Sequence, residues 1–416
     1  MNKVIAFSLA VALSLPLYAA SWQEDGYELV EAVVLSRHNI RSPLSGPGSA
    51  ISRITPHKWF EWTSAPAELS KKGAVLETRM GQFFAEWMED EGLFSRNALP
   101  APGEVRIYSN SMQRTIATAR YFSAGMFPVA NIDAEYHCPV GTMDPVFHPQ
   151  ITDASEEFVA RAMEEIVSMG GDEGMSGLCR PVQKNLALIG RILDMRKAPA
   201  AANDTISFKT DDVQVKFTQN AEPFLSGGLK LARNAADALI LQYYEDPSPR
   251  KAAFGHRLSH SGWEDVAEVI DLYHHILFGA PSVAVQVARP LLRTILSELN
   301  AEGRKFSFLC GHDSNIYTVL TALQCEEIHL PEAIEKSTPI GCKIVICKWR
   351  GNDGGLYADL RMVYGSDAQI RSMSPLSLQN PPVSVPVYLK GLKSNQDGKY
   401  LLADLEERII QVINTK

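Results

Sequence analysis

The chain has 416 residues and a formal net charge of -8, with 45% hydrophobic and 21% charged residues. This composition is ordinary for a globular protein, and at this length the core is expected to divide between two domains. The acidic balance argues against nucleic acid or an anionic membrane surface as the main partner. Any binding of anions must therefore depend on a local cluster of basic side chains.

Residues 1–20 have the pattern of an export signal. A positive charge at residue 3 precedes an apolar run over 4–17, and small residues end the segment. The run is too short to cross a bilayer comfortably, and no later segment is apolar over a spanning length. We expect cleavage near Ala20, export to a bacterial periplasm and no membrane association of the mature protein.

Strands and helices alternate through the first third of the chain. The sequence YELVEAVVLS predicts an increasingly apolar strand at 27–36, and EVRIYSN predicts a second strand at 104–110. A helix follows each strand, the first with apolar residues at helical spacing over 76–87 and the second with Ser111 as a candidate cap. This alternation indicates a largely parallel sheet flanked by helices.

The middle of the chain is mainly helical, and the sheet resumes after it. A strand at 305–311 runs into a helix, and a final antiparallel pair is joined by the turn GNDGG. We therefore predict an α/β fold with a mostly parallel sheet, in which a mainly helical second domain is inserted. The predicted boundaries are an α/β catalytic domain at 22–150 and 300–416, and a helical insertion domain at 151–299.

All six cysteines lie beyond the export signal, so they are expected in an oxidising compartment that favours disulfides. A bridge between Cys342 and Cys347 is excluded. Both residues lie on one predicted strand, where five steps separate them by roughly 16 Å, beyond the ~7 Å limit for two bridged Cα atoms. The other pairings stay open. The cysteine spacings match neither a zinc site nor a CxxC redox motif, and we expect no metal and no cofactor.

Polar clusters follow three of the predicted strands. The sequence RHNIR at 37–41 follows the first strand, Arg114 follows the second, and His312 and Asp313 follow the strand that ends at 311. Ligands bind beyond the carboxyl ends of the strands in open α/β sheets, because those ends share one edge. We therefore expect three arginines and two histidines to converge there.

These side chains suit phosphoryl transfer. Guanidinium groups match phosphate oxygens, and nearby positive charge keeps an imidazole neutral and nucleophilic. On this basis His38 is the candidate nucleophile and Asp313 the candidate acid for the leaving alcohol. The candidate phosphate-binding residues are Arg37, Arg41, Arg114 and His312.

The segments SRHNIRSP and GHDSN resemble the signatures RHGxRxP and HD of the histidine acid phosphatases. Other segments, including TPHKWFEW, SNSMQRTIATA, GTMDPVFHPQIT and TPIGCKIV, are similar to the glucose-1-phosphatase branch of that family. The likeness covers most of the mature chain. Asn39 stands where the related phytases usually have glycine.

The resemblance implies an α/β domain with a helical insertion and a phosphohistidine intermediate on His38. It also implies that a glutamate contacts the sugar, and the segment QNAEPFLSG places this glutamate at Glu222. The cysteines depart from the family pattern, because a pair expected near the C-terminus is missing and Cys342 and Cys347 are added. No disulfide pairing is therefore transferred from the family.

The sequence thus predicts an acid phosphatase that hydrolyses sugar phosphates such as glucose 1-phosphate. The alternatives are a phytase and a phosphosugar-binding protein without catalytic activity, and a homodimer is also left open. The pair His274 and His275 suggests a metal site. A structural role is favoured, because adjacent residues of a helix point to different faces and no carboxylate follows at i+4.

Overall fold

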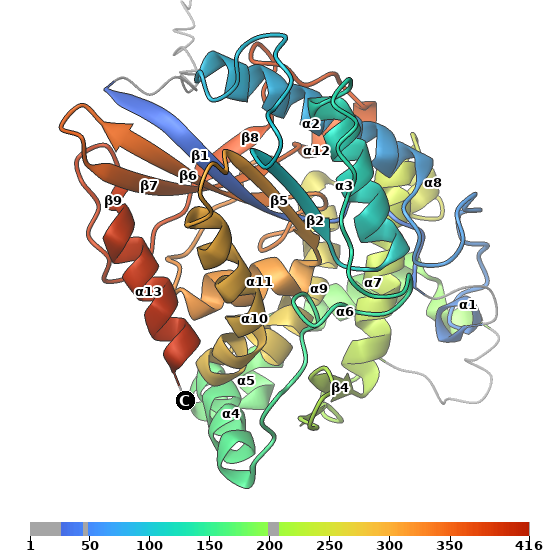
Figure 1. The fold of residues 1–416 in the computed structure, drawn as a ribbon. Helices are drawn as coiled ribbons and strands as arrows, with labels where there is room; N and C mark the ends of the chain where they lie inside the picture. The colour runs from blue at the N-terminus through green and yellow to red at the C-terminus, as the bar shows by residue number, and fades with distance from the viewer. Residues whose placement is uncertain (1–25, 45–48, 199–207, 416) are drawn as a thin grey trace, which may run out of the picture.

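The computed structural model describes residues 26–44, 49–198 and 208–415. A seven-stranded sheet lies at the centre of one half of the molecule (Figure 1), in the order β2-β5-β1-β6-β7-β8, with β9 beside β7. Its strands are β1 (Tyr27–Arg37), β2 (Val105–Ser109), β5 (Phe306–Gly311), β6 (Lys343–Gly351), β7 (Leu356–Tyr364), β8 (Val383–Pro386) and β9 (Tyr400–Leu401). Two short strands, β3 (Gln214–Lys216) and β4 (Phe224–Ser226), form a separate hairpin.

The described helices include every helix predicted from the sequence. The α-helices are α1 (Ala50–Arg53), α2 (Lys71–Asp90), α3 (Gln113–Met126), α4 (Glu156–Met169), α5 (Met175–Cys179), α6 (Gln183–Ile192), α7 (Gly228–Glu245), α8 (Pro249–Ala252), α9 (His260–Phe278), α10 (Pro281–Leu299), α11 (Asp313–Ala322), α12 (Asp367–Ser372) and α13 (Leu402–Asn414). Two 3-10 turns are η1 (Gly171–Glu173) and η2 (Met195–Lys197). One predicted detail is wrong, because Met112 occupies the N-cap position of α3 and the Ser111 hydroxyl instead accepts the amide of Cys138.

Strand β1 lies in the interior of the sheet, with a neighbouring strand on each side. It pairs in parallel with β5 on one side and antiparallel with β6 on the other, and β5 pairs in parallel with β2. Its side chains alternate between two cores: Val33 and Leu35 pack with α10, α11 and α13, whereas Ala32 and Val34 pack with α2 and α3. Coverage of both faces explains why the sequence of this strand is almost continuously apolar. The predicted α/β fold class is confirmed.

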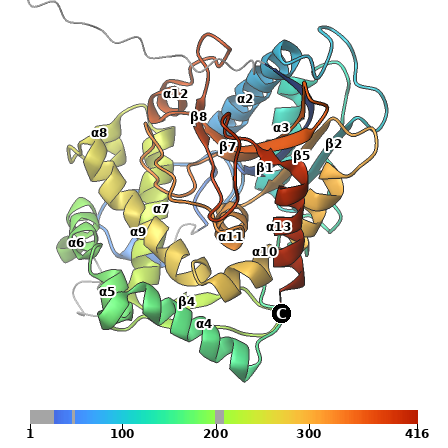
Figure 2. The same cartoon turned by 90° about the vertical axis from the view of Figure 1, so that its left-hand side faces the viewer.

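Helices α4 to α9 gather beside the sheet around a core of their own (Figure 2). Helix α10 joins the two halves. Its residues Val283 and Val287 belong to the helical core, while Leu291 and Ile295 belong to the core beneath the sheet. The domain boundaries at 151 and 299 stay a prediction.

The six cysteines are all free thiols in this structure, which therefore gives no support to the disulfides expected from the sequence. Cys342 directly precedes β6 and Cys347 lies on it. The two residues therefore follow one extended segment, which was the reason for excluding a disulfide between them. The predicted export signal at 1–20 lies outside the described residues. In the part of the chain that is described, no helix has the length and apolar character needed to span a membrane.

Helices α2 and α3 pack against each other through two glycines. A Cβ atom added at Gly81 would overlap the carbonyl oxygen of Phe122, and one added at Gly125 would overlap the carbonyl oxygen of Thr78. Both neighbours are backbone atoms that cannot move aside independently. The two helices can therefore approach this closely only because neither position has a side chain.

We expect Gly81→Ala to destabilise the protein by about 1–3 kcal/mol, because it forces apart the two helices that cover the sheet. The matched control is Gly190→Ala in α6, where an added Cβ meets only the Met195 sulfur at 3.5 Å. There the gain in helix propensity makes a neutral or slightly stabilising effect the expected result. Urea unfolding of the two variants measures the difference, and equal stability would contradict this packing.

Candidate active site

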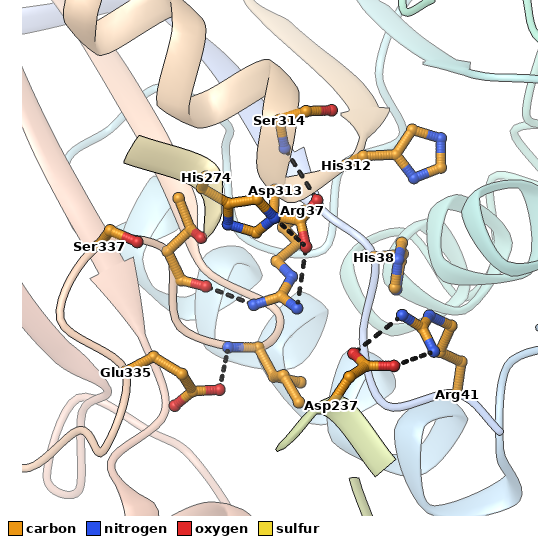
Figure 3. Close-up of polar contacts among 12 residues, drawn as sticks. Arg37, His38, Arg41, Asp237, His274, His312, Asp313, Ser314, Glu335 and Ser337 are labelled. Carbon is orange, nitrogen blue, oxygen red and sulfur yellow. Dashed lines mark hydrogen bonds and ion pairs between the residues drawn. The ribbon is translucent and has the colours of Figure 1, made fainter. Parts of the chain in front are cut away.

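Five of the predicted site residues lie together at and beyond the ends of the parallel strands β1 and β5 (Figure 3): Arg37, His38, Arg41, His312 and Asp313. Arg37 ends β1 and His38 follows it, while Gly311 ends β5 and His312 follows at the start of α11. The register pairs Arg37 with Gly311, and the amide of His38 donates to the Gly311 carbonyl at 3.1 Å. The two histidines therefore leave the sheet at the same level, with ring centroids 5.5 Å apart.

His38 is held as a neutral imidazole in one tautomer. Its Nδ1 lies 2.8 Å from the backbone carbonyl oxygen of Asn39, and a carbonyl can only accept, so Nδ1 carries the hydrogen. Burial, followed by the charges of Arg114 and Arg41, holds the pKa of His38 well below its usual value. The Nε2 atom therefore keeps a lone pair that is available to an electrophile.

A buried network supports the backbone beside His38. The side-chain amide of Asn39 donates to Glu77 of α2 at 2.8 Å, and the other oxygen of Glu77 lies 2.8 Å from the ammonium of Lys343. Both charged side chains are 0% exposed. The amide of Ser70, the residue before α2, donates to the Ile40 carbonyl at 2.8 Å. Because losing one partner would leave a buried charge unpaired, this network resists movement of the Asn39 backbone.

The three predicted arginines lie in this site, and each has an N–H donor that no described residue accepts. Arg41 makes a bidentate ion pair with Asp237, at 3.1 and 3.2 Å, and Arg37 contacts Asp313 at 3.3 Å. Arg114 lies within 3.4 Å of the His312 ring, and its burial, with the charge of Arg41, lowers its pKa to about 10. The Nε atom of each arginine is buried, and no described residue accepts a hydrogen bond from it. A bound anion would satisfy these donors.

Asp313 is an ionised carboxylate in the free site. It contacts Arg37, and its Oδ2 lies 3.8 Å from Nε2 of His274. Burial opposes ionisation, but His274 and Arg37 outweigh it and hold the pKa of Asp313 well below its usual value. Burial lowers the pKa of His274 to about 4. A proton on Asp313 therefore requires a change in the charge around it.

Two side chains that the sequence analysis did not assign to the site come from the helical region. Asp237 of α7 pairs with Arg41, and His274 of α9 faces Asp313, as Figure 3 shows. Asp237 is an acidic residue in the C-terminal part of α7, where most residues are buried and apolar, and Arg233 lies one turn before it, so this pattern could have identified it. The structural role favoured for the histidine pair fits only His275, whose Nδ1 contacts the Tyr317 hydroxyl at 2.9 Å.

Glu222 lies at the edge of the site. Its carboxylate is half-exposed and lies 3.5 Å from Nε2 of His148. Partial burial raises its pKa, and the charges of Arg114 and Asp313 reach it. Glu222 is therefore next to the cluster without contacting the other predicted site residues. Over the described residues, no group of three or more histidine, cysteine, aspartate or glutamate side chains is arranged to hold a metal ion.

Comparison with known proteins agrees with this geometry. Residues 28–364 match the histidine phosphatase superfamily (branch 2). The chain is 35% identical to the glucose-1-phosphatase of Salmonella typhimurium, covering 95% of this chain and 94% of the relative. It is 32% identical to the glucose-1-phosphatase of Providencia rettgeri, covering 95% of each. The apo form of Hafnia alvei phytase superposes with a TM-score of 0.85 at 25% identity, covering 94% of this chain and 98% of that one. The chain therefore belongs to branch 2 of the histidine phosphatase superfamily.

Proposed function

We propose that the protein is a phosphatase that hydrolyses sugar phosphates, glucose 1-phosphate first among them, through a phosphohistidine on His38. The observation that carries this proposal is the neutral His38 imidazole, whose Nε2 lone pair is free beside three arginines with unused donors. A neutral imidazole close to a bound phosphoryl group is a competent nucleophile. The two glucose-1-phosphatase relatives support the choice of substrate.

Binding of the phosphoryl group begins with an exchange of partners. In the free site, Arg37 and Arg41 are paired with Asp313 and Asp237. A phosphoryl dianion offers the guanidinium groups more charge than a single carboxylate does, and its oxygens match their planar donors. As Arg37 turns its donors to the phosphoryl oxygens, Asp313 loses its counter-charge and gains a negative neighbour. Both effects raise the pKa of Asp313.

The first chemical step transfers the phosphoryl group to the protein. The Nε2 lone pair of His38 forms a bond to phosphorus as the phosphorus–oxygen ester bond breaks, and protonated Asp313 donates its proton to the departing sugar oxygen. The Asn39 carbonyl accepts from Nδ1–H and stabilises the positive charge that develops on the ring. The cationic side chains around the phosphoryl oxygens stabilise the transition state, a role that metal ions fill in other phosphoryl-transfer enzymes.

The second step releases phosphate. Asp313, now a carboxylate, takes a proton from a water molecule as that water forms a bond to phosphorus. The phosphorus–nitrogen bond breaks and returns its electron pair to Nε2, so His38 is again neutral. The cycle consumes one ester and one water and yields one alcohol and one phosphate.

A phytase is the second candidate function, because the Hafnia alvei phytase shares the fold over nearly the whole chain. The surroundings of the site favour the smaller substrate. The carboxylate of Glu222, half-exposed at the edge of the site, acts on the cluster electrostatically and repels the further phosphates of an inositol ring. A binding protein without catalytic activity would tolerate loss of the nucleophile or the acid, and this chain has both. Export to the periplasm and a homodimer stay predictions from the sequence.

We expect the kcat/KM for glucose 1-phosphate to exceed the kcat/KM for phytate by about tenfold or more, because the added phosphates of phytate meet the Glu222 carboxylate. Activity should persist in EDTA, since guanidinium groups stabilise the transferring phosphoryl group. Initial rates of phosphate release measure both. A larger kcat/KM for phytate would favour the phytase reading, and loss of turnover in EDTA would refute the metal-free mechanism.

We expect Asp313→Asn to lower kcat/KM for glucose 1-phosphate by about 10²–10⁴-fold, since the sugar alkoxide then leaves without a proton. The loss should be much smaller for p-nitrophenyl phosphate, whose leaving group is stable as an anion. The kcat/KM is the right measurement because it reports the steps up to formation of the phosphohistidine.

The matched control for this experiment is Asp353→Asn, which removes the same charge in the β6–β7 turn at the opposite end of the sheet. It should leave the kcat/KM for both substrates unchanged. An equal loss on both substrates in Asp313→Asn would show that Asp313 does not act as the proton donor.

A further inference from the structure

We propose that Asn110 fixes the tautomer of His312, so that His312 donates a hydrogen bond to the phosphoryl group while its imidazole is neutral. Asn110 is 0% exposed and follows the last residue of β2. It contacts the His312 ring on the side away from Arg114, through a different ring nitrogen. The inference deepens the proposed function and rests on it, because it takes His312 as a ligand of the phosphoryl group.

The orientation of the Asn110 amide follows from its neighbours. Its Oδ1 accepts the backbone amides of Ser111 and Asp144, each at 2.8 Å. Backbone N–H groups can only donate, so the reverse orientation would place the NH2 group against two donors and lose both hydrogen bonds. The NH2 group must therefore face the other way.

The Asn110 NH2 group faces His312. Its Nδ2 lies 2.6 Å from the Nε2 atom of His312, so that ring nitrogen accepts and carries no hydrogen. In a neutral imidazole the hydrogen is then on Nδ1. Both histidines thus carry the hydrogen on Nδ1, for different reasons. In His38 a carbonyl accepts from Nδ1, whereas in His312 the Asn110 donor occupies the lone pair of Nε2.

Each ring nitrogen of His312 faces a group that can only donate: Nε2 faces Nδ2 of Asn110 at 2.6 Å, and Nδ1 faces Nη2 of Arg114 at 3.4 Å. A neutral ring accepts at only one nitrogen, and the much shorter contact with Asn110 takes the lone pair. The hydrogen then lies on Nδ1, where Nδ1–H and the Arg114 donor can share one acceptor. A phosphoryl oxygen placed between them would accept from both, and the tautomer set by Asn110 is what makes His312 the second donor.

Protonation of His312 does not supply this donor. Burial and the charge of Arg114 hold the pKa of His312 well below its usual value, although Asp313 acts in the opposite direction. The neutral form of the ring is therefore favoured in the free site, where the tautomer decides what Nδ1 offers. The charged and titratable groups that face His312 are Arg114 on α3, Arg37 at the end of β1, His38 and Arg41 after it, and Asp313 on α11.

The backbone around this pair is also fixed. The amide of Asn110 donates to the Cys310 carbonyl at 2.9 Å, and its carbonyl accepts the Thr115 hydroxyl at 2.7 Å. The amide of His312 donates to Asn315 at 2.9 Å. Neither side chain can therefore turn away easily, and Asn110 acts as a positioning residue for His312.

The variant Asn110→Asp tests the proposal with almost no change in shape. One carboxylate oxygen still accepts the amides of Ser111 and Asp144, but the other oxygen accepts where Nδ2 donated. It therefore draws a hydrogen onto Nε2 of His312 and raises the pKa of that ring. Below the raised pKa, the imidazolium carries both hydrogens and still donates from Nδ1. Above it, Nδ1 presents a lone pair to the phosphoryl oxygen.

The measured quantity is the inhibition constant of inorganic phosphate for Asn110→Asp divided by the constant for wild type. We expect this ratio to rise by about tenfold or more as the pH increases through the raised pKa of His312 in the variant. The control is Asn352→Asp, which adds the same charge in the β6–β7 turn at the opposite end of the sheet and should keep the ratio near one at every pH. A ratio for Asn110→Asp that is raised equally at all pH values would mean a general charge or folding effect and would overturn the proposal.

A second measurement needs no turnover and no variant at position 110. Nitrogen-15 NMR of histidine-labelled wild type, with His312 assigned by its absence in His312→Gln, should show hydrogen on Nδ1 and none on Nε2. Hydrogen on Nε2 would overturn the proposal even if the protein proves to be the proposed phosphatase. If the tautomer is as expected but glucose 1-phosphate and other phosphomonoesters are not hydrolysed, the proposed function fails instead.

Discussion

The hydrogen bond from Nδ1 of His38 to the Asn39 carbonyl is the contact on which the proposed chemistry depends. It leaves the Nε2 lone pair free and gives the ring a partner for the positive charge that develops during attack. The carbonyl can serve this purpose because its own residue is anchored through Glu77 to Lys343, both fully buried. A buried ion pair adds little stability in general, but here it holds one backbone carbonyl at a defined position.

Two of the three guanidinium groups in the site are paired with carboxylates before any substrate binds. Arg41 is paired with Asp237 and Arg37 with Asp313, which offsets part of the cost of burying three guanidinium groups together. An incoming phosphoryl group replaces carboxylates that are already in place. In the proposed cycle this exchange also changes Asp313 from an ionised carboxylate into a proton donor, which links binding of the anion to the first chemical step.

Local sequence was enough to predict the sheet edge and the residues that follow its strands, because His38 and His312 are placed by strands whose apolar pattern is clear. It could not assign Asp237 and His274, since these depend on where α7 and α9 pack against the sheet, and that packing is set by contacts distant in the sequence. The cap assigned to Ser111 failed for a similar reason, because its hydroxyl is used by the distant Cys138 amide. Parallel pairing was predicted as a class, whereas the register that aligns both histidines required the structure.

The position of the phosphoryl group on the trapped protein tests this account most directly. Rapid acid-free quenching after mixing with 32P-labelled glucose 1-phosphate, followed by tandem mass spectrometry of the peptide that contains residue 38, identifies the modified residue. Chromatography of a base hydrolysate against the two phosphohistidine isomers identifies the modified ring nitrogen. The proposed mechanism predicts label on Nε2 of His38 that is stable in base and lost in acid. Label on Nδ1, label on another residue, or turnover with no labelled protein at any time would contradict it.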